Sequence, residues 1–236
     1  MTRPLPLYRR SLGESWRSLI GWSLGFLTAL LLYVPLFSSI GGNPDMQALL
    51  DSLPPAMISA LGYGAIATGA GYVSAPFYGL MGFALSTIAA VAWSSAAIAG
   101  DEELGSLELT LAHGVTRTQV VLERSAAIIT KLVWLNVLSV LVIFALNDSA
   151  GLGLEFGNLV AVGAALLGIS VLIAMVGIAA GALTGRRGWA TGAAAGVAVA
   201  SYALNAVANQ STDLDWLHSW SPYAWAFHNA PLSDGA

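Results

Sequence analysis

The chain has 236 residues, of which 56% are hydrophobic and 9% are charged, and its formal net charge is −4. Together with a mean hydropathy of +0.72, this composition excludes an ordinary soluble domain. The sequence has no basic stripe for nucleic-acid binding, and the absence of cysteine excludes disulfides and thiolate metal sites. We therefore expect an all-α, polytopic helix bundle that forms one transmembrane domain over residues 1–236.

The first 17 residues carry four arginines and precede a long uncharged run. Ser11 and Glu14 form an S-x-x-E capping box, which predicts that a helix begins at Ser11. We expect residues 1–17 to form an amphipathic elbow that lies on the inner leaflet and turns into the first span. A frayed N-terminus is the alternative. The run lacks the small-residue cleavage pattern of a signal peptide.

Five apolar stretches approach or exceed the roughly 20 residues that a membrane-spanning helix needs. These stretches cover residues 18–37, 74–99, 126–146, 157–184 and 189–208. Lys131 lies near one end of the third stretch, and we expect its side chain to snorkel to the aqueous surface. A functional lysine inside the membrane is the alternative.

The two longest polar connections, residues 38–71 and 209–236, are expected to be external. In the first, Asp45 predicts the start of an amphipathic surface helix, with an apolar face formed by Met46, Leu49, Leu50 and Leu53. In the second, the aromatic residues are typical of a belt at the outer membrane interface. They are Trp216, Trp220, Tyr223 and Trp225.

Glycines recur about every four residues across the fourth and fifth stretches, at Gly177, Gly181, Gly185, Gly188, Gly192 and Gly196. This spacing lets helix backbones approach closely in lipid. It predicts close packing between spans four and five, or between two copies of the chain.

Every lysine and arginine falls in the N-terminal region, in residues 101–131 or at Arg186 and Arg187. Five spans place all of these groups on one side of the membrane. The positive-inside rule identifies that side as the cytoplasm, so we expect a cytoplasmic N-terminus and a cytoplasmic loop at residues 101–124.

Residues 100–124 read GDEELGSLELTLAHGVTRTQVVLER and hold five of the thirteen acidic residues. Leucines in this loop recur at helical spacing and form one apolar stripe with Val115. Gly114 is suited to end that helix, and Thr116 with Gln119 forms a T-x-x-Q capping box for the next one. The pattern predicts a short amphipathic helix, which is either a solvated connector or a docking helix for a partner protein.

The loop motif resembles the cytoplasmic loop between the second and third spans of type-2 ATP-binding-cassette (ABC) exporter permeases, in particular actinobacterial antibiotic and multidrug exporters. The matching features are the Glu102–Glu103 pair, the Gly105–Ser106 step, Glu108–Leu109, and residues 116–124 leading into the next helix. Residues 71–85 also resemble the start of the second span. In this family a sixth span normally follows a W-SPY-W segment, whereas this sequence stops without one.

The resemblance implies a plasma-membrane permease subunit that moves a hydrophobic small molecule or antibiotic out of the cell. Its partners would be a separate ATPase subunit, a second permease copy or homologue, and membrane lipid. The residues that it implies for a stiff coupling helix and its rim are Glu102, Glu103, Leu104, Gly105, Ser106, Leu107, Glu108, Leu111, His113 and Arg117. In this arrangement Leu104, Leu107 and Leu111 dock into an apolar groove of the ATPase.

No phosphate-binding loop or catalytic motif occurs in the sequence. We therefore expect this chain to bind no cofactor, with ATP and Mg²⁺ held by the partner ATPase. His113 is expected inside and His218 and His228 outside, so the three cannot share a metal ion. A non-transporting scaffold, a membrane-embedded enzyme with a cytoplasmic partner, and an ion-coupled carrier are the alternatives. The lack of acids within the spans argues against a proton-coupled carrier.

Overall fold

The computed structural model describes residues 5–40, 54, 57, 66, 68–103, 105–112 and 114–234. Every regular element within these residues is a helix, which confirms the expected all-α class. Five helical stretches are long and apolar enough to cross a membrane, namely Trp16–Ser39, Gly69–Glu103, Arg117–Ala150, Phe156–Thr184 and Arg187–Ala208. The surface helix predicted after Asp45 lies outside the described residues.

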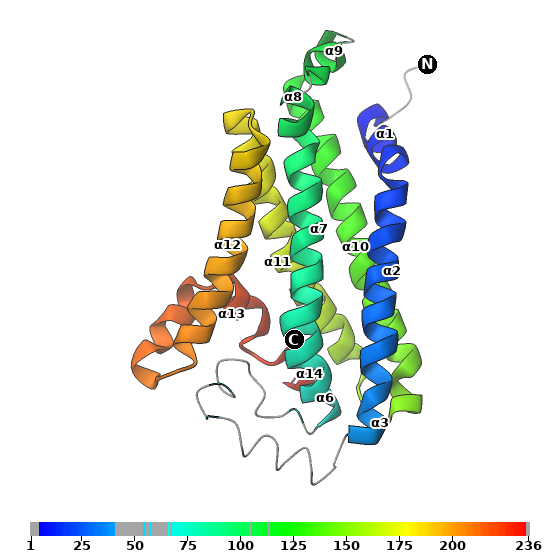
Figure 1. Cartoon of the computed structure of the whole chain (residues 1–236), viewed down its shortest axis with the longest axis vertical. Coiled ribbons are helices and arrows are strands. Elements are labelled where there is room, and N and C mark those ends of the chain that lie inside the picture. The colour runs from blue at the N-terminus through cyan, green and yellow to red at the C-terminus, as the bar shows by residue number, and fades with distance from the viewer. Residues whose placement is uncertain are drawn as a thin grey trace.

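The elements follow one another along the chain with short connections (Figure 1). An N-terminal helix and the first span comprise α1 (Pro6–Glu14), α2 (Trp16–Tyr33), η1 (Val34–Leu36) and α3 (Phe37–Ile40). The second span comprises α6 (Gly69–Tyr72), η3 (Val73–Gly82), α7 (Phe83–Ser95), η4 (Ala96–Gly100) and α8 (Asp101–Glu103). The remaining elements are α9 (Ser106–Ala112), α10 (Arg117–Ala150), α11 (Phe156–Thr184), α12 (Arg187–Ala208), η5 (Thr212–Trp220), α13 (Pro222–Phe227) and α14 (Pro231–Asp234).

The second, third and fourth spans form the centre of the bundle. In their most apolar windows 56%, 50% and 44% of the residues are buried inside the protein, against 17% for the first span and 22% for the fifth. Figure 1 shows α2 and α12 on opposite sides of α7, α10 and α11. The first and fifth spans are therefore the peripheral ones, with most of their surface left for lipid or another protein.

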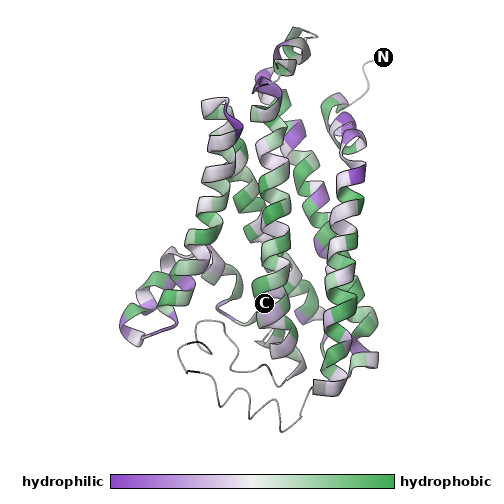
Figure 2. Cartoon of the chain, viewed as in Figure 1, coloured by the Kyte–Doolittle hydropathy of each residue, from purple (hydrophilic) through white to green (hydrophobic). Residues whose placement is uncertain are grey.

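One end of the bundle carries α1, α8, α9 and the turn between α11 and α12 (Figure 1). We call it the basic end, because the arginines of these elements gather there, including Arg10, Arg117 and Arg186. Figure 2 shows hydrophilic residues near this end on α1 and α8, and mostly apolar residues along the middle of the long helices. This distribution is that of a membrane-spanning bundle.

Helix α1 begins at Pro6, so the prediction that a helix starts with a capping box at Ser11 is wrong. Ser11 lies inside α1, and its carbonyl accepts the backbone N–H and the hydroxyl of Ser15 at the break before α2. Figure 1 shows α1 standing above the start of α2. Its buried apolar residue, Leu7, packs on other parts of the chain, so this residue does not serve the leaflet contact expected for the elbow.

The second span is widened near the end opposite the basic end. Pro76 lies inside the π-helical segment η3, and proline lacks the N–H that would continue the α-helical ladder. A π-helical turn shifts the hydrogen-bonding pattern and leaves backbone groups for other partners. The carbonyl of Gly79 within η3 accepts a hydrogen bond from the hydroxyl of Tyr223, at 2.9 Å.

The segment after α12 folds back against the bundle, which corrects part of the predicted external belt. Tyr223 is 8% exposed and Leu232 2% exposed, and the hydroxyl of Ser221 donates to the carbonyl of Ser201 in α12 at 2.6 Å. The prediction that Tyr223 lies in a surface belt is wrong, because its ring and hydroxyl fill the space beside the widened second span. Trp216, Trp220 and Trp225 are exposed, as such a belt requires.

Candidate functional site

The 101–124 segment projects beyond the bundle at the basic end (Figure 1). It contains α8 and α9, which are separated by Gly105 at a φ of +69°. Glycine occupies this left-handed region without the strain that a Cβ would add. The expected stiff helix over residues 101–113 is therefore interrupted after Glu103, and α9 is a separate helical turn pair joined to the second span by a bend.

The end of α9 and the start of α10 have the local structure that the sequence predicts. Gly114 has a φ of +81°, and its N–H donates to the carbonyl of Leu111 at 3.1 Å. The Thr116 hydroxyl then accepts the N–H of Gln119 at 3.2 Å. Only this half of the capping box forms, because the Gln119 amide donates to Glu123 at 2.6 Å.

The apolar side of α9 packs against the same chain. Leu107 is 8% exposed and forms a cluster with Leu7 of α1 and Val120 of α10, with Leu111 and Val115 partly buried beside it. The expectation that Leu107 lies on a free apolar stripe is wrong, because hydrophobic burial is satisfied internally by the elbow helix. Leu104 and His113 lie outside the described residues.

The outward side of the 101–124 segment is polar. Glu102, Glu103, Glu108 and Arg117 are exposed, and so is Gly105. Ser106 begins α9. Of the residues expected to contact an ATPase, the structure therefore turns the charged ones outward and Leu107 inward, which is the arrangement of a polar rim without an apolar centre.

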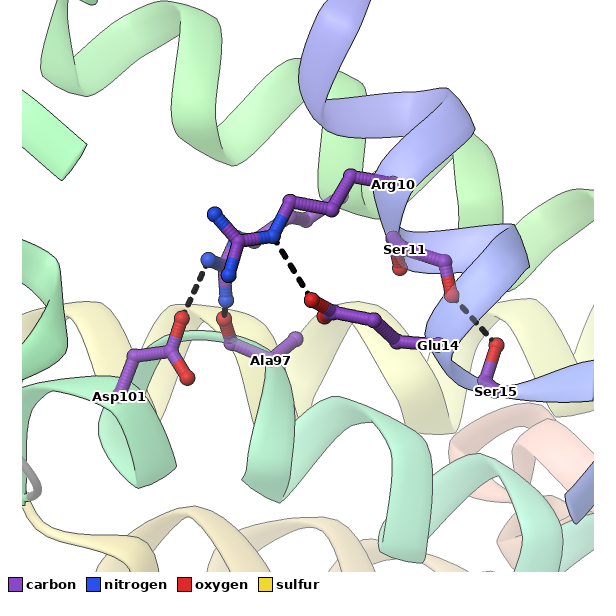
Figure 3. Close-up of polar contacts among 7 residues, drawn as sticks. Arg10, Ser11, Glu14, Ser15, Ala97 and Asp101 are labelled. Carbon is purple, nitrogen blue, oxygen red and sulfur yellow. Dashed lines mark hydrogen bonds and ion pairs between the residues drawn. The ribbon is translucent and has the colours of Figure 1, made fainter. Parts of the chain in front are cut away.

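An ion pair closes the base of the segment. The Arg124 guanidinium at the start of α10 contacts the Asp101 carboxylate and donates to the carbonyl of Ala97 in the second span. Figure 3 shows Ala97 and Asp101 facing Arg10 and Glu14 of α1. Arg10 donates to Glu14 at 2.7 Å, and this hydrogen bond raises the pKa of the Arg10 guanidinium, so the pair stays charged.

Two carboxylates join the segment to distant helices, and neither contact is evident from local sequence patterns. Glu123 accepts the backbone N–H groups of Leu7 and Tyr8 at 2.7 and 2.9 Å. Glu103 accepts the N–H of Arg187 at 2.8 Å. Sequence reasoning missed Glu123; its one available signal was an acidic residue at the apolar side of a helix, four residues after Gln119.

The model of the ABC-2 family transporter proteins matches residues 5–213 of the chain. The chain belongs to this family. It is therefore a multi-pass plasma-membrane protein and the permease component of an ABC transporter. Neither the curated proteins nor the solved structures compared with the chain gave a match.

The glycines of this ABC-2 permease divide into two groups. A Cβ at Gly177 would lie 2.9 Å from the Cβ of Ser94 in α7, and one at Gly181 would lie 3.3 Å from the Cβ of Ala99. These two glycines therefore allow α11 to approach the second span. By contrast, Gly192 and Gly196 of α12 have no atom within 4 Å of the Cβ position, so they do not pack spans four and five together.

Gly185 has a third role, as the left-handed residue that ends α11, with a φ of +64°. A Cβ there would lie 2.9 Å from the carboxylate carbon of Glu102. The turn into α12 is thus covered by the same acidic pair that begins the 101–124 segment.

Lys131 of the permease is buried, and the prediction that it snorkels to the aqueous surface is wrong. It is 4% exposed, its ammonium lies 4.5 Å from the centre of the Trp93 ring, and it donates to the hydroxyl of Ser15 at 3.3 Å. The side chain does point toward the break between α1 and α2. A cation over an indole face is stabilised by the ring quadrupole, which holds the third span against the first and second.

Metal binding has no support in the part of the chain that the structure describes, where no group of three or more His, Cys, Asp or Glu side chains could hold an ion. His218 and His228 stack with ring centres 4.3 Å apart. The nitrogens of His218 lie within hydrogen-bond distance of Asp215 and Asn209. These contacts give the pair a structural part in the η5 turn.

Proposed function

We propose that this permease is the transmembrane half of an exporter that moves a hydrophobic small molecule or antibiotic out of the cell. The energy comes from ATP hydrolysed by a separate ATPase subunit, which binds at the 101–124 segment. The observation that carries the proposal is the position of this segment: it projects from the basic end, outside the apolar bundle, with its charged residues facing outward.

The polar rim is suited to a charged protein surface. Glu102, Glu103 and Glu108 supply negative charge, and Arg117 supplies positive charge. Complementary charges at such a rim speed association and fix the orientation of the partner. The apolar side of α9 stays on Leu7 and Val120, so force on α9 reaches the elbow helix and the third span directly.

ATP and Mg²⁺ belong to the partner in this proposal, because the sequence has no phosphate-binding loop and its single lysine, Lys131, is buried. Closure of two ATPases would draw the 101–124 segments of two permeases together. Rigid-body movement of the bundles then opens a path between them. The outward direction and the substrate class rest on the family resemblance.

A second permease copy has a suitable surface on α12. Gly192 and Gly196 face open space, and Val199 beside them is 69% exposed. Small residues at this spacing let two helices meet closely in lipid. Leucine at both glycines is expected to abolish cross-linking between copies through a cysteine at Thr191; unchanged cross-linking would place the contact elsewhere.

Reconstitution tests the proposed function. The permease and the ATPase encoded next to its gene are placed in vesicles with the basic end outward, and ATP-dependent uptake of a hydrophobic dye is measured. Glu108→Arg is expected to weaken ATPase binding about tenfold, roughly 1.4 kcal/mol. Glu155→Arg, at the opposite end and equally exposed, is the control.

Three results would contradict the proposal in different ways. Uptake driven by a proton or sodium gradient without nucleotide would indicate an ion-coupled carrier. ATPase binding without any dye movement would favour a scaffold. Turnover of a substrate by the permease alone would favour a membrane-embedded enzyme.

A further inference from the structure

The two peripheral spans begin with helices that have no cap of their own. Helix α1, which leads into the first span, follows Leu5 without a side-chain cap, and α12 follows Arg186 without one. The first N–H groups of any α-helix lack a partner within the helix. Both N-termini therefore need acceptors from elsewhere, and both find them in the 101–124 segment.

Glu123 supplies the acceptor for α1. One carboxylate oxygen accepts the N–H groups of Leu7 and Tyr8 at 2.7 and 2.9 Å, and the other accepts the Gln119 amide at 2.6 Å. Glu123 is only 4% exposed, so water does not compete effectively for these bonds. Charge-assisted hydrogen bonds in such surroundings are strong, and a negative charge at a helix N-terminus is further stabilised by the helix dipole.

Glu103 supplies the acceptor for α12, through the N–H of Arg187 at 2.8 Å. This side chain is exposed, so we expect its contribution to be weaker than that of Glu123. The hydrogen bond nevertheless runs along the axis of the helix that it caps, as do those made by Glu123. A displacement of either carboxylate along that direction pulls or releases the whole helix.

The capped helices lead into the spans that are least held by the rest of the protein. Only 17% of the first span's apolar window and 22% of the fifth span's are buried, against 44% to 56% in the three central spans. Little internal packing has to be broken for the peripheral spans to move. The Asp101–Arg124 ion pair meanwhile keeps the two carboxylates on one unit with α9 between them.

We infer that Glu103 and Glu123 are positioning residues that transmit movement of α9 to the fifth and first spans by capping their leading helices. The inference rests on the proposed function, since it needs an ATPase that moves α9. It adds which spans respond and which atoms hold them. Leu107 on Leu7 supplies the apolar half of the same connection to α1.

Hydrogen exchange on the full chain in detergent tests the caps themselves. Glu123→Ala is expected to speed amide exchange at Leu7 and Tyr8 about tenfold, the equilibrium equivalent of one lost helix cap. Glu103→Ala is expected to do the same at Arg187, by a smaller factor. Glu123→Gln keeps an acceptor oxygen and is expected to restore most of the protection. Unchanged exchange in the alanine variants would overturn the inference.

Pulsed spin-label distances test the transmission. The chain has no cysteine, so labels at Ile20 of α2 and Val199 of α12, both exposed, report the separation of the first and fifth spans. In the complex with the neighbouring ATPase, ATP with vanadate is expected to shift this separation. The Glu103→Ala, Glu123→Ala double variant is expected to lose at least half of the shift while still binding the ATPase and hydrolysing ATP.

The two hypotheses fail in distinguishable ways. A parent complex whose separation ignores nucleotide would overturn the proposed function, and the inference with it. A double variant that shifts as far as the parent would overturn the inference alone. Glu155→Ala, at the opposite end of the bundle, is the matched control and is expected to shift like the parent.

Discussion

Gly177 and Gly192 occupy equivalent places in the sequence spacing but face different surroundings. The first lies where α11 meets the second span, and the second faces open space on α12. The spacing alone indicates that helices approach closely, but it does not say which neighbour each glycine meets. That depends on the rotation of each helix, which tertiary packing determines.

Substitution by alanine distinguishes the two glycines. Gly177→Ala would bring its Cβ within 2.9 Å of the Ser94 Cβ, and overpacking of this kind costs about 1–3 kcal/mol. Gly192→Ala is expected to be neutral or to stabilise by up to about 1 kcal/mol, because alanine is the better helix former. Thermal unfolding of the monomer in detergent measures both. Equal effects would contradict the packing of α11.

Tyr223 carries a second prediction at this scale. Tyr223→Phe leaves the Gly79 carbonyl in η3 without the hydroxyl donor 2.9 Å away, and an unsatisfied buried acceptor costs about 1–3 kcal/mol. The expected result is a lower unfolding temperature and faster proteolysis of the 212–234 segment. Trp216→Phe, at an exposed position, is expected to change neither, and a drop of the same size there would contradict the assignment.

At the scale of elements, α9 shows what could be read from the sequence and what could not. Gly114 and Thr116 marked the end of α9 and the start of α10, because a positive φ and an N-cap depend on a few neighbouring residues. The partner of the apolar stripe depends on where α1 lies, more than 90 residues away in the sequence. The Glu123 cap is non-local in the same way, since it joins residues 116 positions apart.

The buried position of Leu107 leads to a prediction that differs from that for a free docking residue. Leu107→Asp would place a carboxylate between Leu7 and Val120, and an unpaired charge in an apolar cluster is strongly unfavourable. We expect α9 to detach, with faster amide exchange over residues 106–112 and around Leu7, even without an ATPase. Glu108→Asp, on the exposed side of the same helix, is the control. Exchange unchanged by Leu107→Asp would mean that the cluster does not hold α9.

At the scale of the whole molecule, the five spans were predictable because hydropathy and length act over whole helices. Their ends were less so: α10 begins at Arg117 and continues to Ala150, since charged residues extend a helix beyond the apolar region. The fold-back of residues 212–234 could not be read from composition. Aromatic residues suit both a membrane interface and a buried position, and only the gap beside η3 decides for Tyr223.

The orientation of the bundle is the prediction that belongs to this scale. Single cysteines at Gly13 and Glu108 are expected to react with a membrane-impermeant maleimide only after cells are permeabilised. One at Asp213 is expected to react in intact cells, because the positive-inside rule places the basic end in the cytoplasm. Labelling at Glu108 in intact cells would invert the topology and remove α9 from the reach of an ATPase.

The long-range cap on α1 also has a consequence for biogenesis. The N–H groups of Leu7 and Tyr8 leave the ribosome long before Glu123, which follows Leu7 by 116 positions. Until the third span has been made and inserted beside the first, α1 has no acceptor for these groups and its first turn frays. The helix synthesised first is therefore completed only when the middle of the chain arrives, and slowed insertion of the third span would prolong its exposure to proteases.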